Sequence, residues 1–232
     1  WDFGDGTGTN NTCDPNLSYN YLVAGPGTYH VVLTVCDGPN LSGNCDNDTV
    51  MITVFAMPEP AAILSDTIIC ANEEICFFDQ TSLGDTTINT WLWDFGDGQI
   101  QPPGPDDTIC HIYTNPGTYV PTLQVLDNNG CAGTANLTTI VVNEGPNAAF
   151  NVSPNLGGSP TIIGCNPGPD NPVFFTDNST SANSSITSWS WDFDDGNTST
   201  SSTDTNIYLN AGTYNVTLTV TDANGCTDSI VQ

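Results

Sequence analysis

Hydrophobic and polar residues alternate along several short segments of this chain. In three places a Gly-Thr-Tyr tripeptide opens such a segment, and every second side chain is then apolar over residues 29–35, 119–125 and 214–220. A period of two residues is the pattern of a strand that buries one face. Asp-x-Asn-Gly turns follow at 127–130 and 222–225. No stretch has a helical period, so the pattern predicts an all-β protein.

Two sequence strings recur in the same order. Trp-Asp-Phe-Gly-Asp-Gly occupies residues 1–6 and 93–98, and residues 191–196 repeat it with Asp194 in place of the first glycine. The Gly-Thr-Tyr string follows each time. A repeat of roughly 90 residues is too long for a solenoid and indicates a tandem array of small domains.

The aromatic residues around the first string also alternate, as in Trp91, Trp93 and Phe95. This strict alternation favours packing in a core over an exposed platform that stacks on sugars. Short strands separated by Gly, Pro and Asn turns over about 90 residues are typical of an immunoglobulin-like sandwich.

The two strings together resemble the PKD domain, an immunoglobulin-like sandwich found on cell surfaces. The resemblance covers all three repeats. It implies extracellular spacer, adhesion and scaffold roles, and it implies no catalytic residues within the units themselves. The segment 221–229 also resembles the repeats of large Bacteroidota surface and gliding adhesins.

The repeats predict three units. Residues 1–55 form a unit that lacks its N-terminal strands, residues 60–143 form a complete unit, and residues 147–232 form a unit that lacks the end of its last strand. The segments 57–60 and 143–146 contain proline and are short, so we expect stiff linkers and a rod-like array.

Composition excludes several classes of function. The chain has 26 acidic residues and neither Lys nor Arg, for a formal charge of −26. It cannot neutralise a nucleic-acid backbone, bind an anionic membrane through a basic patch, or use a lysine or arginine in catalysis. No apolar run is long enough to span a bilayer, so no direct membrane insertion is expected.

Nine cysteines without zinc-like spacing indicate disulfides and an extracellular or cell-surface location. Aligning the units places Cys45 at the position of Cys131, with its partner upstream of Trp1. A disulfide between the Cys45 residues of neighbouring subunits is the alternative. The alignment predicts the pairs Cys165–Cys226, Cys70–Cys131, Cys76–Cys110 and Cys13–Cys36.

Asp5, Asp97 and Asp195 lie in the turn of each Trp-Asp-Phe string. Such carboxylates can accept backbone N–H bonds and fix the turn. Together with Asp106 and Asp107 they could instead hold Ca²⁺, although no EF-hand or nonapeptide spacing accompanies them. In either case, so much unpaired negative charge predicts that divalent cations bind somewhere on the chain.

Catalysis is not predicted. Paired carboxylates such as those of a glycosidase recur as turn residues in every unit, and no nucleophile has a His/Asp set that persists among the units. His30 and His111 have no histidine counterparts in the other units, and we expect both at the surface or at the rim of the core.

Five Asp-Ser/Thr tripeptides ending in a small or aliphatic residue resemble the O-glycan acceptor of Bacteroidota. Asn-x-Ser/Thr sequons also occur, as at Asn136 and Asn178. The predicted O-glycan acceptors are Thr49, Thr67, Thr86, Thr108 and Ser229.

The sequence therefore predicts a non-catalytic, disulfide-linked and glycosylated stalk or filament subunit of a cell-surface protein. Its expected partners are neighbouring PKD units or fibre subunits. One alternative is the non-catalytic accessory region of a secreted chitinase or protease. Another is a fibre in which a neighbouring subunit donates the strands missing from the first unit.

Overall fold

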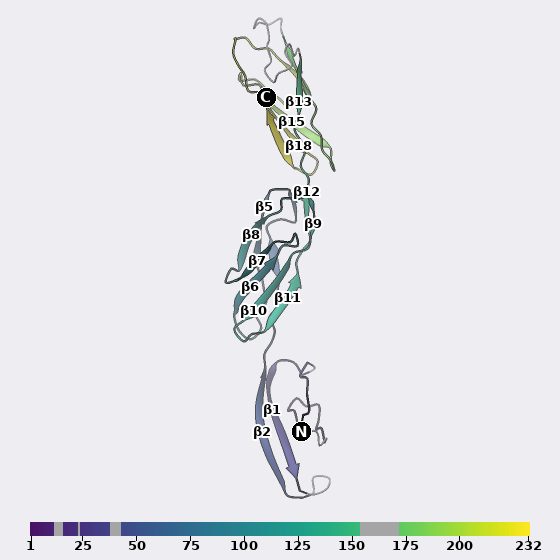
Figure 1. The fold of residues 1–232 in the computed structure, drawn as a ribbon, viewed down its shortest axis with the longest axis vertical. Helices are drawn as coiled ribbons and strands as arrows, with labels where there is room; N and C mark the ends of the chain where they lie inside the picture. Colours follow the sequence, from purple (N-terminus) through teal and green to yellow (C-terminus); the bar gives the residue numbers. More distant parts are fainter. Residues whose placement is uncertain (12–15, 23, 38–42, 154–171) are drawn as a thin grey trace.

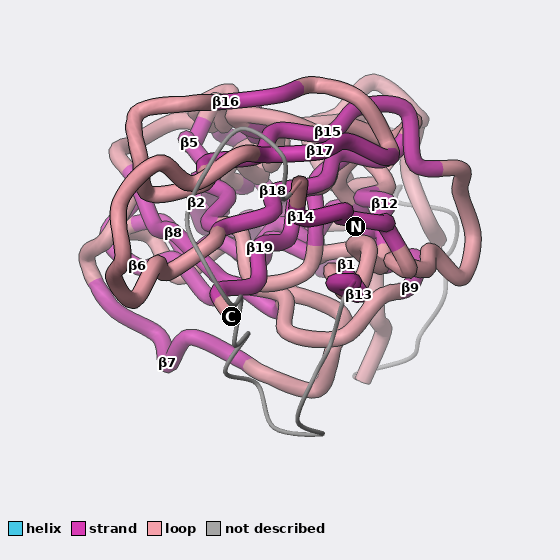
Figure 2. The backbone as a smooth tube through the Cα atoms, turned by 90° about the horizontal axis from the view of Figure 1, so that it is seen from above, coloured by secondary structure: helices cyan, strands magenta, loops and turns pink. Residues whose placement is uncertain are grey.

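The computed structural model describes residues 1–11, 16–22, 24–37, 43–153 and 172–232. All regular elements within these segments are strands, which confirms the predicted all-β class. None of the described residues belongs to a helix able to cross a bilayer. Three bodies follow one another along the longest axis of the molecule (Figure 1) and overlap when viewed along that axis (Figure 2). We call them unit one (1–55), unit two (60–143) and unit three (147–232).

Unit two contains three sheets that share one core. A four-stranded sheet, in the order β11-β10-β6-β7, packs against two three-stranded sheets in the orders β3-β5-β8 and β4-β12-β9. All pairs are antiparallel except that β12 runs parallel to β4. The strands are β3 (Ala62–Leu64), β4 (Ile68–Cys70), β5 (Glu74–Asp79), β6 (Ile88–Asp94), β7 (Ile100–Gly104), β8 (Thr108–Ile112), β9 (Gly117–Tyr119), β10 (Thr122–Asp127), β11 (Ala132–Asn136) and β12 (Ile140–Asn143).

The core of unit two is built around the indole of Trp93. Trp93 is fully buried and lies opposite Leu123 in the ladder between β6 and β10. Phe77 approaches it from β5, with ring centroids 5.9 Å apart. Phe95 is also buried and Trp91 packs at the edge of the same core. The alternating aromatic residues therefore form the core, as the sequence predicts.

Unit three repeats this arrangement. Its sheets have the strand orders β16-β15-β18-β19 and β13-β14-β17. Trp191 lies opposite Leu218, as Trp93 lies opposite Leu123. The strands are β13 (Phe150–Ser153), β14 (Val173–Asp177), β15 (Ile186–Asp192), β16 (Thr198–Ser199), β17 (Thr203–Asn206), β18 (Thr217–Asp222) and β19 (Thr227–Val231).

In the described part of unit one, the strands form one long hairpin of β1 (Gly27–Cys36) and β2 (Cys45–Val54). Asp2 in the Trp-Asp-Phe string forms a bridge with Val32 of β1. The inner face of this small sheet is only partly covered. Its buried hydrophobic residues are Phe3, Tyr29 and Val31.

We predict that Leu123→Ala lowers the free energy of unfolding of unit two by about 2–5 kcal/mol, because the side chain is fully buried against Trp93. Leu83→Ala is the matched control, since Leu83 is 60% exposed and should change stability by less than about 0.5 kcal/mol. Urea unfolding followed by tryptophan fluorescence measures both. Equal effects of the two substitutions would contradict the assigned core.

Candidate functional site

The second aspartate of each Trp-Asp-Phe string is hydrogen-bonded through both carboxylate oxygens. Oδ1 accepts the backbone N–H two residues ahead, at 2.9 Å for Asp97 and 3.0 Å for Asp195. Oδ2 contacts a side chain from a distant segment, and these side chains occupy corresponding positions in the three units. The pairs are Asp5–Tyr19, Asp97–His111 at 2.8 Å and Asp195–Asn206 at 2.7 Å. These contacts fit the turn-fixing role.

His111 does not lie at the open surface, and of the two expected positions it is closer to the rim of the core. The ring is 9% exposed and stacks on Phe95, with centroids 4.0 Å apart. Because His111 lies on β8 and faces the core, its imidazole can reach Asp97 in the turn after β6. His30, by contrast, is exposed, as expected.

The structure does not gather the residues predicted to bind calcium. The backbone carbonyl of Asp106 accepts the indole N–H of Trp93 at 3.2 Å, and that of Asp107 accepts the N–H of Asp79 at 2.9 Å. Neither residue joins Asp97 in a group of three potential ligand atoms within the described residues. A structural Ca²⁺ ion remains a prediction that these contacts do not favour.

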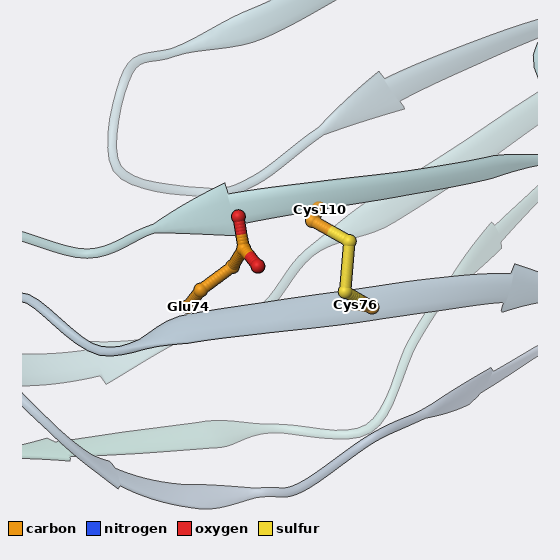
Figure 3. A group of neighbouring side chains, drawn as sticks. All are labelled: Glu74, Cys76 and Cys110. Carbon is orange, nitrogen blue, oxygen red and sulfur yellow. A yellow bond between two sulfur atoms is a disulfide. The ribbon is translucent and has the colours of Figure 1, made fainter.

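The described residues contain one group with metal-ligating spacing: Glu74, Cys76 and Cys110. Figure 3 shows that the two sulfur atoms form a disulfide between β5 and β8, beside the Glu74 carboxylate. A sulfur in a disulfide is not a thiolate ligand, so this group offers a metal only one carboxylate. The bond is the Cys76–Cys110 pair that the sequence predicts.

Two neighbouring tyrosines recur in every unit, and only the second of them was predicted from the sequence. Their rings are stacked in units one and two and tilted in unit three. In unit two, the hydroxyl of Tyr113 donates to the Phe95 carbonyl at 2.8 Å, and that of Tyr119 donates to the Asn115 carbonyl at 2.9 Å. The two rings lie 4.6 Å apart. A tyrosine ahead of each Gly-Thr-Tyr string was the available signal. The pairs are Tyr21–Tyr29, Tyr113–Tyr119 and Tyr208–Tyr214.

The predicted disulfide Cys70–Cys131 is wrong. Cys70 ends β4 and lies opposite Asn143, where the chain leaves unit two for unit three. Cys131 lies in the hairpin between β10 and β11, at the other end of the unit (Figure 1). A unit-by-unit alignment identifies corresponding positions, but it does not show which end of the sandwich they occupy.

The structure instead joins Cys70 to Cys226 of unit three, with their Cα atoms 5.6 Å apart. This disulfide links two units, and it excludes the predicted pair Cys165–Cys226. Cys165 itself lies outside the described residues. Cys131 has no disulfide partner and is partly buried.

The predicted pair Cys13–Cys36 is also wrong, because Cys36 bonds Cys45 across the β1–β2 hairpin. Cys13 lies outside the described residues. The alignment of Cys45 with Cys131 is one residue out of register: Asn44 accepts the Asp37 N–H, as Cys131 accepts the Asp127 N–H. Cys45 therefore faces Cys36 in the ladder and needs no partner upstream.

At both junctions between units, residues at corresponding positions form backbone hydrogen bonds with the following unit. After unit one, Glu59 pairs with Ser82 through two backbone hydrogen bonds of 3.0 Å. After unit two, Asn147 pairs with Thr180 in the same way, at 2.7 and 3.0 Å. The chain at each junction therefore forms an isolated antiparallel bridge with the segment that precedes β6 or β15 of the following unit.

A second set of contacts lies two or three residues away. The Ala56 N–H donates to Asp85 Oδ2 at 2.5 Å, and at the next junction Asn183 Nδ2 donates to Glu144 Oε2 at 3.4 Å. Gly84 lies so close to the linker that an added Cβ would overlap the Ala56 carbonyl oxygen. The linkers are therefore fixed onto the unit that follows them.

The hairpins that carry Cys131 and Cys226 are also equivalent. Asp127 Oδ1 accepts the Cys131 N–H at 2.8 Å, and Asp222 Oδ1 accepts the Cys226 N–H at 3.0 Å. Both aspartates are buried. Burial and the negative charges of Asp127 and Asp85 raise the pKa of the Cys131 thiol.

The predicted O-glycan acceptors are accessible to different degrees. Thr49, Thr108 and Ser229 are exposed, whereas Thr67 and Thr86 are half-buried. Asp48 and Asp66 each accept the N–H of the following threonine, so these carboxylates have a local structural role. Modification of the five residues remains a prediction.

The geometry defines a tandem array of immunoglobulin-like sandwiches, and the sequence places it in a family. Residues 1–54, 56–142 and 166–232 match the PKD domain. The chain therefore belongs to the PKD-domain family, as the resemblance predicts.

Two similar solved structures are single PKD domains. The PKD1 domain of Vibrio anguillarum Epp is 23% identical, over 38% of this chain and 99% of that one, with a TM-score of 0.33. The PKD1 domain of the Vibrio cholerae metalloprotease PrtV is 30% identical, over 36% of this chain and 96% of that one, with a TM-score of 0.30.

Alkaline pH should destabilise unit three through Tyr208. Burial raises its pKa to about 12, from 10.0 for an unperturbed tyrosine. The folded state therefore holds the proton more tightly than the unfolded state between these values, so the free energy of unfolding falls as pH rises above 10. Tyr208→Phe should cost about 1 kcal/mol at pH 7, through the lost bond to the Phe193 carbonyl. The variant should also weaken the decline above pH 10. Urea midpoints from pH 8 to 12 measure both effects, and an unchanged decline would be evidence against the assigned burial.

Gly84→Ala should loosen the junction between units one and two, because the new methyl group overlaps the Ala56 backbone. A loss of about 1.4 kcal/mol in closing the linker corresponds to a tenfold increase in cleavage after Phe55 by a chymotrypsin-like protease. Gly104→Ala is the control, since its nearest neighbour would be 3.7 Å away. Equal cleavage of the two variants would show that this contact does not hold the linker.

Proposed function

We propose that the chain is a non-catalytic spacer array of an extracellular protein, which holds other parts of that protein at a distance from the cell. The supporting observation is the Cys70–Cys226 disulfide, which gives units two and three a second covalent connection beside their linker. Domains joined only by a linker usually move relative to one another. Two connections remove much of this freedom, which suits a stalk.

The surface chemistry supports an extracellular location. Disulfides persist in oxidising compartments. A chain without Lys or Arg offers no cleavage site to trypsin-like proteases. Its charge of −26 favours solubility and attracts cations, and we propose divalent cations among these counter-ions.

Glycosylation and a place in a cell-surface stalk or filament belong to the same proposal. Thr49, Thr108 and Ser229 are exposed on strands and have room for a sugar. Their acceptor pattern, together with the segment 221–229, supports a bacterial surface adhesin of the Bacteroidota type. Intact-mass measurement of protein from its native source tests this, because an unmodified mass removes the glycan part of the proposal.

A second candidate is the accessory region of a secreted hydrolase. The supporting observation is that PrtV, whose PKD1 domain is 30% identical, is a metalloprotease. An accessory region that presents substrate should be retained on insoluble chitin or collagen. A spacer should stay in the supernatant at physiological salt, so sedimentation with these polymers separates the two candidates.

The spacer proposal predicts that the disulfide keeps the junction between units two and three straight. In electron micrographs of the oxidised full chain, the angle between these units should have a narrow distribution. The double variant Cys70→Ser/Cys226→Ser should broaden it several-fold, while the thermal unfolding of each unit changes little. The control is Cys76→Ser/Cys110→Ser, which removes a bond within unit two and should leave the angle unchanged. A broad distribution in the oxidised chain would contradict the proposal.

A further inference from the structure

Strand β2 of unit one has an open edge where unit two has a strand. In unit two, β12 pairs with β9 on one side and, in parallel, with β4 on the other, so that Cys70 lies opposite Asn143. In unit one, Ile52 pairs with Tyr29 as Ile140 pairs with Tyr119. The end of β2 therefore corresponds to β12, and within the described residues no strand pairs with its other edge.

Two side chains at this edge are less buried than their counterparts. Ile52 is 38% exposed, whereas the corresponding Ile140 is 0% exposed, and Val54 is partly buried, whereas the corresponding Val142 is 3% exposed. Phe55, which corresponds to Asn143, is 42% exposed. In unit two the matching face packs against Ile69 of β4. Unit one thus presents an apolar strand edge shaped for a parallel strand like β4.

Cys131 lies at the junction after unit one as Cys226 lies at the junction after unit two. Each is in a hairpin fixed by a buried aspartate, and each hairpin lies beside the preceding linker. A Cβ added to Gly133 would overlap the Pro58 carbonyl oxygen, and a Cβ added to Gly145 would lie 3.7 Å from the Cβ of Cys226. At the junction between units two and three, the cysteine of this hairpin, Cys226, forms a disulfide with Cys70 at the end of β4.

We propose that Cys131 forms a disulfide with a cysteine at the end of a β4-type strand, which pairs in parallel with the open edge of β2 and places that cysteine opposite Phe55. The strand belongs to the same polypeptide, in sequence N-terminal to Trp1. Each junction of the array would then be fastened in the same way, by a strand end of one unit and the hairpin of the next. This inference goes beyond the spacer function, which does not require it.

Formation of the bond removes one proton and one electron from each thiol. A disulfide-bonded oxidoreductase of the export compartment accepts the two electrons and is reduced to its dithiol. The Cys131 thiolate first forms a mixed disulfide with the oxidant. The second cysteine then attacks the Cys131 sulfur and releases the reduced oxidant. Glutathione disulfide supplies the same oxidation in vitro.

The chain itself provides the test. We design a fusion protein in which residues 1–146 are followed directly by residues 59–232. It contains two copies of unit two, and the first copy, with its own β4 and linker, precedes the second. We expect the Cys131 of the second copy to bond the Cys70 of the first after oxidation in a glutathione buffer. The first copy's Cys131 follows unit one as before, so it should stay reactive toward iodoacetamide and serves as an internal control. Peptide mapping without reduction, using an aspartate-specific protease because trypsin has no site, detects the bond.

Single substitutions show which copy of Cys131 forms the disulfide. Cys131→Ser in the second copy should abolish the Cys70–Cys131 peptide and leave one additional alkylated thiol, whereas Cys131→Ser in the first copy should leave the peptide intact. Alkylation of both Cys131 residues would overturn the proposal, as would a bond from Cys131 to the Cys70 of its own copy. Mixed ¹⁴N and ¹⁵N protein tests for donation by a second molecule: linked peptides carrying both labels would also overturn it.

The same mapping on the full-length protein from its source provides a second measurement, which does not depend on folding of the joined chain. Cys131 should be linked to a cysteine of a preceding PKD unit. A free Cys131 in that protein would overturn the inference. The spacer proposal would survive that result, because the Cys70–Cys226 bond would still hold its own junction straight.

Discussion

The carboxylates of this protein must be stabilised without basic side chains. With 26 acidic residues and neither Lys nor Arg, their hydrogen-bond donors among the described residues are backbone N–H groups, hydroxyls, amides, the indole of Trp189 and the imidazole of His111. Most of the aspartates solve this locally by accepting an N–H two residues ahead, which fixes a turn. Examples are Asp79, Asp94, Asp127, Asp177 and Asp222. The abundance of aspartate and the tight turns are therefore connected, because the carboxylates accept the backbone N–H groups that fix the turns.

These turns determine where the units can be joined. Asp127 and Asp222 each accept two backbone N–H bonds, one of them from the cysteine that ends the hairpin. A hairpin fixed in this way holds its cysteine at the entry end of the unit. The strand β4 holds Cys70 at the exit end, opposite Asn143. The fold of each unit thus places the cysteine at the end of β4 and the cysteine of the hairpin at the ends where consecutive units meet.

The sequence predicted the strands and cores well, because both depend on local pattern. Trp93 and Trp191 are buried as their alternation requires, and the strands that follow the Gly-Thr-Tyr strings pair in antiparallel fashion. The predicted strand 119–125 is divided between β9 and β10, however, and the predicted strand 214–220 begins only at Thr217. The buried contact between His111 and Asp97 could not be predicted, because it joins a strand residue to a distant turn, and the other units hold Tyr19 and Asn206 at the position of His111. The side chain that contacts the aspartate differs from unit to unit, whereas the accepting aspartate carboxylate is the same in all three.

The disulfides show the limit of sequence reasoning more clearly. Cys76 and Cys110 could be paired because both are absent from unit three, which is a property of one unit. Cys70 and Cys226 could not, since their closeness depends on how two units are stacked. Cys45 was misplaced by one residue because the loop before it differs in length from the equivalent turns, and in a strand such a shift places a side chain on the other face.

A covalent bond at the junction suits an array whose units all carry the same sign of charge. At the junction after unit two, Glu73 accepts the N–H of Cys70 and Asp228 of unit three accepts the N–H of Ala148, so each side carries a carboxylate. Surface charges interact over a Debye length of about 8 Å at physiological salt, so neighbouring units repel where they meet. Ion pairs cannot offset this repulsion in a chain without Lys or Arg. A disulfide can, and its strength does not depend on ionic strength, so the absence of basic residues and the bond between Cys70 and Cys226 are best understood together.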